Sequence, residues 1–442
     1  MKRFACQFEQ FMRLAVVVML LCGLWSCDGA LDEKNIVTTT SCGTPPEFRT
    51  EGVDPAVSEA IGKAIASARE SSDPKNWGHL GMTYMAHGFR VEAAECFQCA
   101  QELGSTDASW PYLAALCIVA ERPDESVALL ARAVEFSDEQ QLTPLIRLGE
   151  LLAELDRLDD ASSRFALVLK RDPINVRAHL GMGRIAHRRG ELKESLEHLT
   201  KAAEHPSSKR AANLLLAQVH LALGDRDASL AARGTATRNR DESWPDPFLG
   251  EVSRLRVGLK ASLAKADWLY DHGVYDQAIE IMQRAVRDYP DSEWAWIVLG
   301  KSLIKKKKYA DAQDALEKAL EIAPNSSEAQ FRMGVIYFRR NIPSLAVEWF
   351  RKTIATKPDF TMAHYNLGLC LSEAGDREGA IESFSAAVAS QPECAEAHAL
   401  LGDILAKANR KEEAIAHLEN AVSLAPNLTW ARVRLREVRL MP

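Results

Sequence analysis

The chain has 442 residues, of which 47% are hydrophobic and 26% are charged, and its formal net charge at pH 7 is −7. This composition is typical of a folded protein and excludes global disorder. Proteins that bind nucleic acid concentrate positive charge, so we expect no nucleic-acid partner. A single compact core is unusual at this length, and we expect several domains or a repeat array.

Residues 1–26 have the pattern of a secretory signal peptide. Lys2, Arg3 and Arg13 provide a positive start, and an apolar run of twelve residues follows from Leu14 to Trp25. A membrane-spanning helix needs about 20 apolar residues, so this run is short for a span but suits a signal-peptide core.

The end of this run resembles the lipobox of bacterial lipoproteins. It reads Leu24-Trp25-Ser26-Cys27, although Trp25 stands where a small or apolar residue is usual. The resemblance implies cleavage before Cys27, lipidation of that cysteine, and anchoring at the cell membrane or in the periplasm of a bacterium. Ordinary cleavage without lipidation and an uncleaved anchor remain alternatives.

Residues 27–53 show little apolar periodicity and contain Pro45-Pro46, which predicts a flexible tether. Asp54-Pro55 then has the pattern of a helix start, with Asp as the N-cap and Pro at the first helical position. We expect residues 54–73 to form a single N-terminal capping helix.

A spacing of 34 residues dominates the rest of the chain. It relates three series of small residues and prolines: Gly300, Gly334, Gly368 and Gly402; Ala278, Ala312, Ala346, Ala380 and Ala414; Pro290, Pro324, Pro358, Pro392 and Pro426. The best single copy contains Trp77, Leu80-Gly81, Tyr84, Ala93, Phe97 and Ala100. This copy closely resembles the tetratricopeptide repeat, a helix–turn–helix unit of 34 residues. The resemblance implies an all-α solenoid of about ten repeats in a right-handed superhelix.

The repeat frame gives two continuous arrays, with five repeats in residues 74–243 and five in residues 259–428. The fifteenth residue of seven repeats is Gly or Asn: Gly88, Gly190, Gly224, Gly273, Asn341, Gly375 and Asn409. These residues accept the left-handed conformation that ends a helix, so we expect the turn there. The second repeat departs from the pattern, with Val127 where a small residue is expected.

Residues 244–258 form an irregular join between the arrays. Trp244-Pro245-Asp246-Pro247 breaks a helix, and Val252, Leu255, Leu259 and Leu263 then follow at helical spacing. We expect a stiff break and a lengthened first helix in the sixth repeat. The insertion is either a simple join or a hinge or docking site. Residues 429–442 are expected to form a C-terminal capping helix, with arginines on its polar side.

The sequence carries no pattern for a phosphate loop, a zinc protease or a serine nucleophile, so we expect no enzyme activity, cofactor or metal. Cys96 and Cys99 form a CxxC in the middle of a helix, where a structural role is favoured over a redox one. His179, His364 and His398 all occupy the fourth place of their repeats, which predicts a packing role.

In the tetratricopeptide family, the first helices of the repeats line a concave surface that binds partners. The resemblance assigns nine residues of the C-terminal array to it: Trp294, Ile297, Lys301, Lys305, Phe331, Phe338, Arg339, Met362 and Tyr365. Aromatic side chains beside cations suit an extended peptide with apolar and some acidic character. Packing of the aromatics against neighbouring helices is the alternative.

The sequence therefore predicts a non-enzymatic scaffold, tethered to a membrane outside the cytoplasm, that binds peptides or proteins. The alternative is an accessory subunit that positions a separate enzyme in envelope biogenesis or metabolism.

Overall fold

The computed structural model describes residues 42, 44–238 and 244–441. The expected signal peptide and Cys27 lie outside the described residues. The chain divides into residues 1–44 and a helical unit from Pro45 to Pro442. In the described part there are 23 helices and no strand, as the repeat pattern predicts. No helix in the described part is long and apolar enough to cross a membrane.

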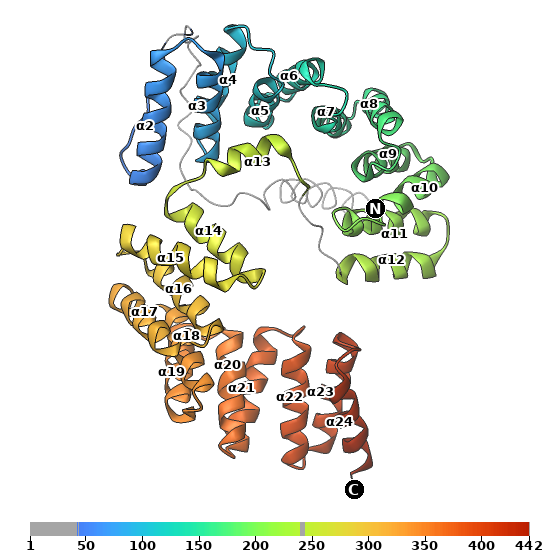
Figure 1. The fold of residues 1–442 in the computed structure, drawn as a ribbon. Helices are drawn as coiled ribbons and strands as arrows, with labels where there is room; N and C mark the ends of the chain where they lie inside the picture. The colour runs from blue at the N-terminus through green and yellow to red at the C-terminus, as the bar shows by residue number, and fades with distance from the viewer. Residues whose placement is uncertain (1–41, 43, 239–243, 442) are drawn as a thin grey trace, which may run out of the picture. The chain divides into compact units, whose positions relative to one another are not determined.

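Figure 1 shows the helices as consecutive antiparallel pairs. The first array contains α3 (Pro74–Ala86), α4 (Arg90–Glu102), α5 (Ser109–Ile118), α6 (Pro123–Phe136), α7 (Thr143–Glu154), α8 (Leu158–Arg171), α9 (Val176–Arg189), α10 (Leu192–Ala202), α11 (Lys209–Ala222) and α12 (Arg226–Arg238). The second contains α14 (Gly258–Asp271), α15 (Tyr275–Asp288), α16 (Glu293–Lys305), α17 (Tyr309–Ile322), α18 (Ser327–Arg339), α19 (Pro343–Thr356), α20 (Thr361–Glu373), α21 (Arg377–Ser390), α22 (Ala395–Lys407) and α23 (Lys411–Leu424). Three helices lie outside the pairs: α2 (Pro55–Glu70), α13 (Pro247–Arg254) and α24 (Thr429–Leu440).

The turns inside the repeats have the left-handed conformation that the sequence predicts. All seven Gly and Asn residues at the fifteenth place have positive φ, from 60° at Asn341 to 90° at Gly88. Asp156 and Lys307 occupy the same place in their repeats and also have positive φ, at 63° and 60°. At Lys307, whose residue type does not favour this conformation, tertiary packing therefore imposes the turn.

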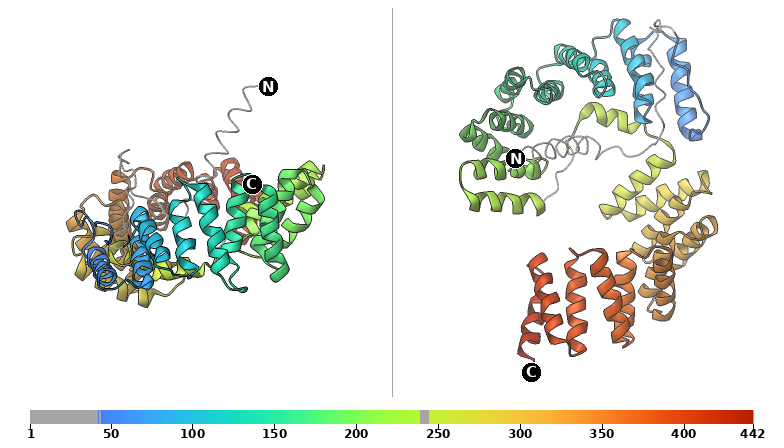
Figure 2. Two further views of the ribbon diagram at one scale, coloured as in Figure 1. Left: turned by 90° about the horizontal axis from the view of Figure 1, so that it is seen from above. Right: turned by 180° about the vertical axis from the view of Figure 1, so that it is seen from behind.

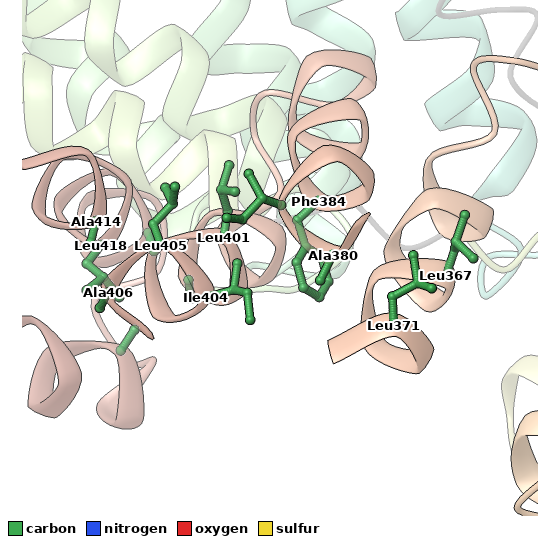
Figure 3. Packing of buried hydrophobic residues seen from close by; sticks show 14 of the residues in the cluster. Leu367, Leu371, Ala380, Phe384, Leu401, Ile404, Leu405, Ala406, Ala414 and Leu418 are labelled. Atoms are coloured by element: carbon green, nitrogen blue, oxygen red, sulfur yellow. The ribbon is translucent and has the colours of Figure 1, made fainter. Parts of the chain in front are cut away.

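Several repeats are held together by a glycine of the first helix and a large side chain of the second. A Cβ atom at Gly334 would lie 2.5 Å from the Phe350 ring, and one at Gly368 would lie 2.7 Å from the Phe384 ring. Figure 3 shows the buried cluster of the last repeats, where Phe384 and Leu418 lie among side chains from several helices. Glycine is required because the ring occupies the space of a side chain.

In the second repeat the second helix begins one residue earlier than the repeat frame predicts. The prediction that the place of the small residue falls at Val127 is therefore wrong. This helix begins at Pro123, and Ser126, which is fully buried, takes the place of the small residue. The Ser126 hydroxyl donates to the Ala115 carbonyl at 3.1 Å, as Ser195 does to Gly183 at 2.8 Å in the fourth repeat. Because the turn between α5 and α6 is one residue shorter, Ser126 instead of Val127 makes the close contact with α5.

The join also differs from the expectation of a lengthened helix in the sixth repeat. The insertion forms a separate helix, α13, which ends at Arg254, before α14 begins at Gly258. Gly258 has a φ of 89°, and its amide neighbour Leu259 donates to the Asp54 carboxylate at 2.9 Å. The left-handed turn breaks the helical periodicity that the apolar spacing indicates.

Two glycines in helix interiors are expected to respond to alanine with opposite signs. Gly334→Ala should lower the free energy of unfolding by about 1–3 kcal/mol, because the new methyl group overlaps the Phe350 ring. Gly62→Ala in α2 should raise it by about 0.5–1 kcal/mol, since a Cβ there meets nothing within 4 Å. Chemical denaturation of both variants tests the pair. Equal effects would contradict the packing described here.

Candidate peptide-binding surface

The first helices of most successive repeats contact one another. In the second array these contacts join α14 to α16, α16 to α18 and α18 to α20. We call the exposed side of this row of first helices the first-helix face. The second helices of the same repeats pack against the other side of the row.

The nine candidate residues fall into three groups. Four are exposed, with Trp294 at 54% and Met362 at 49%, together with Lys305 and Arg339. Lys301, Phe338 and Tyr365 are partly buried.

Ile297 and Phe331 are core residues, at 1% and 5% exposure, and this corrects their assignment to an accessible surface. The Phe331 ring lies 5.8 Å from the Phe350 ring and 5.0 Å from the Phe360 ring. A large side chain at the fifth place of these repeats turns into the gap between repeats instead of facing solvent.

The charges on the face are partly neutralised by the protein itself. The Lys301 ammonium lies 2.5 Å from an Asp267 carboxylate oxygen and 4.6 Å from the centre of the Tyr270 ring. Lys305 is more exposed and approaches the same ring at 5.6 Å. The sequence analysis overlooked Asp267 and Tyr270, although they hold the ninth and twelfth places of the sixth repeat.

Trp268, also in α14, is a further exposed aromatic that the sequence analysis overlooked. It is 58% exposed, and its ring stacks on His272 at a centroid distance of 4.0 Å. Its place in the repeat is not one that the family uses for binding, so no sequence signal points to it. It places a second exposed tryptophan beside the helix that carries Trp294.

The histidines at the fourth place contact the carbonyl of the proline six residues before them. The donor–acceptor distances are 3.0 Å for His179–Pro173, 2.8 Å for His364–Pro358 and 3.1 Å for His398–Pro392. Trp296 and Gln330 donate to the equivalent prolines at 2.8 and 3.0 Å. Each of these side chains has an N–H group to donate, which gives the fourth place a structural role.

Two of these histidines also form matched pairs. The Nδ1 atoms of His179 and His198 lie 2.8 Å apart, and those of His398 and His417 lie 3.0 Å apart. Because the fourth-place ring donates through Nε2 to a carbonyl, a neutral ring accepts through Nδ1 from its partner. Both rings of a pair cannot be protonated and keep this hydrogen bond.

Acidification is therefore expected to destabilise repeats 4 and 10. Burial, and then the charge of the facing histidine, lowers the pKa of His198 and of His417. The unfolded chain takes up protons first as the pH falls below about 6.5, so stability falls until the folded histidines are protonated. Thermal unfolding at about pH 7.5 and about pH 5.5 should show this loss. The variant with His198→Gln and His417→Gln should show a smaller pH dependence, and an unchanged dependence would contradict the assignment.

The CxxC cysteines are buried in α4. Burial raises the pKa of the Cys96 thiol far above its usual range, and burial likewise raises the pKa of Cys117 to about 12. A redox pair needs an accessible thiolate, which these surroundings disfavour. The geometry supports a packing role for Cys96.

Two profiles of the tetratricopeptide repeat match the chain. One matches residues 146–209 and 365–428, and the other matches residues 269–332. These matched segments are tetratricopeptide repeats. Proteins with tetratricopeptide repeats are scaffolds that bind peptide or protein partners, and the fold is typically non-catalytic.

Three solved structures are similar to this chain. YrrB, described as a TPR protein with an unusual peptide-binding site, is 20% identical over 43% of this chain and 98% of its own, with a TM-score of 0.34. TTC0263, a TPR protein from Thermus thermophilus, is 21% identical over 41% and 99%, with a TM-score of 0.35. The APC/C hetero-tetramer Cut9–Hcn1 is 15% identical over 87% and 93%, with a TM-score of 0.39. No curated protein matches the sequence significantly.

Proposed function

We propose that the first-helix face of the second array binds extended peptide segments that carry apolar and acidic side chains. The observation that carries this proposal is the exposure of Trp294, 54% accessible beside a core in which Ile297 is 1% accessible. A half-exposed tryptophan gives a large contact area to a partner at low entropic cost. Met362, two first helices further along, supplies a second apolar contact.

The cations of this face support the acidic character of the partner. Lys305 and Arg339 end α16 and α18, and within the described part of the chain neither forms an ion pair. Such unpaired cations attract acidic groups and steer association. The protein would therefore act as a scaffold without chemistry of its own.

We further propose that a lipid on Cys27 tethers this scaffold to a membrane outside the cytoplasm. The lipobox resemblance supports this location. Treatment of producing cells with globomycin, or Cys27→Ala, should change the migration of the protein and release it from the membrane fraction. Unchanged migration and membrane association would contradict lipidation.

Selection of peptides from a displayed random library against the purified protein tests the binding surface. We expect enriched sequences to combine aromatic or aliphatic residues with Asp or Glu. Trp294→Ala should weaken the selected peptides about tenfold or more, as expected for loss of an aromatic hot spot. Reversing the charge with Lys305→Glu should weaken acidic peptides most at low salt.

Leu345 provides the control. It is 38% exposed in α19, a second helix that does not belong to the row of first helices. Leu345→Ala should leave binding unchanged. Equal losses in Trp294→Ala and Leu345→Ala, or no loss in either, would contradict the assignment of the site.

A further inference from the structure

The insertion packs against the first array, which precedes it in the chain. Helix α13 packs mainly against α3 and α5, the first helices of repeats 1 and 2, and less against the helices before and after it. Figures 1 and 2 show α13 alongside these helices from opposite sides. Phe248 and Val252 are the buried anchors, at 7% and 3% exposure. The Phe248 ring lies 4.6 Å from the Tyr112 ring.

A carboxylate lies at the start of this contact. The Asp246 side chain is 5% exposed and accepts a hydrogen bond of 2.5 Å from the Tyr112 hydroxyl. The Arg147 guanidinium is 3.8 Å away, and the Asp246 carboxylate also caps α13 by accepting from the Leu249 amide at 3.0 Å. A buried carboxylate is costly unless it is paired and hydrogen-bonded, and the first array supplies both partners.

The first array also holds these partners in position. Glu150 contacts Arg147 at 3.3 Å and Arg177 at 2.7 Å. Arg177 lies 5.4 Å from the Trp244 ring, which stacks on His205 at 6.1 Å with an interplanar angle of 9°. The network links three first helices, α5, α7 and α9.

Three of the network residues occupy face-lining places of the repeat, whereas Arg147 stands at the sixth place, beside them. Tyr112, Glu150 and Arg177 stand at the fifth, ninth and second places of repeats 2, 3 and 4, which are places that tetratricopeptide repeats use to line their binding surface. The insertion therefore covers the part of the first array that corresponds to the proposed surface of the second.

We propose that this covered face is a second peptide-binding site and that residues 244–255 are its intramolecular ligand. The partner that fits is a protein segment in which an aspartate stands between two prolines and an aromatic residue flanks each proline. This segment is extended up to the aspartate and helical after it. Such a segment would compete with α13 for Tyr112 and Arg147. This proposal goes beyond the function assigned to the second array.

The size of the intramolecular ligand makes competition feasible. Helix α13 has eight residues, and a helix of this length is not stable alone in water. A shallow cavity of about 550 Å³ beside it is lined by residues that include Arg147, Trp244 and Ser253. A competing segment could therefore begin to contact the array at the exposed edge of the bound segment.

The second array does not repeat the carboxylate site. Its fifth-place tyrosine, Tyr365, is followed at the sixth place of the next repeat by Leu400, where the first array has Arg147. A ligand that is recognised through its aspartate is therefore expected to bind the first array and not the second. Its binding can thus be distinguished experimentally from peptide binding to the first-helix face of the second array.

A synthetic, fluorescently labelled peptide of residues 244–256 is the probe. It is titrated into the wild-type protein and into a variant in which residues 244–254 are replaced by a Gly/Ser linker of equal length. We expect saturable binding to the linker variant at least about tenfold tighter than to the wild type, where the site is occupied.

Three changes identify the contacts. Tyr112→Phe in the linker variant, and Asp246→Asn in the peptide, should each weaken binding about tenfold or more. The first removes the hydroxyl that donates to the Asp246 carboxylate, and the second removes the negative charge that faces Arg147. Trp294→Ala in the linker variant should have no effect, since it lies in the other array. Equal binding to wild type and linker variant, or no binding to a folded linker variant, would overturn the proposal.

Hydrogen exchange on the intact protein covers the case in which the linker variant does not fold. Asp246→Asn should increase amide exchange in α13 about tenfold or more, while α22 and α23 keep their protection. Added unlabelled peptide should raise exchange in α13 of the wild type by displacing it. If exchange in α13 responds to neither change, the segment is a fixed structural join and the proposal fails.

Discussion

Phe350→Ala is expected to lower the free energy of unfolding of the second array by about 3–5 kcal/mol, the range for deletion of a buried aromatic side chain. The Phe350 side chain is fully buried and lies directly against Gly334, which has no side chain to fill the space left behind. The Phe331 ring, 5.8 Å away, loses its neighbour as well. The cavity left by the Phe350 ring can therefore close only if whole helices move.

The effect should be local, because each repeat contacts only its neighbours and stability is nearly a sum of repeat and interface contributions. Chemical denaturation followed by hydrogen exchange should show α18 to α21 opening first. Leu345→Ala in the same helix is the control, since Leu345 is 38% exposed and should cost far less. A similar loss in both variants would contradict the role of Phe350.

Asp54→Ala is expected to cost about 2–4 kcal/mol, because one carboxylate caps two helices that are far apart in sequence. It accepts hydrogen bonds from the Ala56 amide of α2 and the Leu259 amide of α14, both at 2.9 Å, and from the Tyr289 hydroxyl at 2.8 Å. Burial alone would raise the pKa of Asp54, but the hydrogen bonds from Leu259, Tyr289 and Ala56 outweigh it and lower the pKa. The contribution of these Asp54 hydrogen bonds to the free energy of unfolding is thus fully present above about pH 4 and is lost on further acidification.

Asp73 provides a matched comparison for Asp54. It caps α3 alone, through a hydrogen bond of 2.9 Å from the Lys75 amide. Asp73→Ala should cost about 1 kcal/mol. Hydrogen exchange should show faster exchange at the start of α14 in Asp54→Ala and not in Asp73→Ala. If the two substitutions cost the same, the contact between Asp54 and α14 contributes nothing to stability.

The candidate site was only partly predictable from the sequence. The repeat places identify Trp294 and Lys305 as accessible residues of the first-helix face, but they treat Ile297 and Phe331 in the same way. The place of a residue in the repeat determines on which side of its own helix the residue lies. The direction of a large side chain depends on the helix stacked beside it, and Phe331 turns toward Phe360, the N-cap residue of α20.

The sequence by itself determined the features that depend on short separations along the chain. The 34-residue spacing predicts the helix pairs, and Gly or Asn at the fifteenth place predicts the left-handed turns, because these contacts lie within one repeat or between adjacent repeats. The shift in the second repeat was not predicted, although Ser126 stands next to the predicted place.

Only the tertiary structure decided where the insertion lies. The contacts that place it join Tyr112 to Asp246 across 134 residues, Asp54 to Leu259 across 205 and Asp54 to Tyr289 across 235. No period relates these residues, so no repetition in the sequence marks them as partners. Their pairing depends on the path of the whole first array, which brings a carboxylate of the insertion against a tyrosine and an arginine placed there by separate repeats.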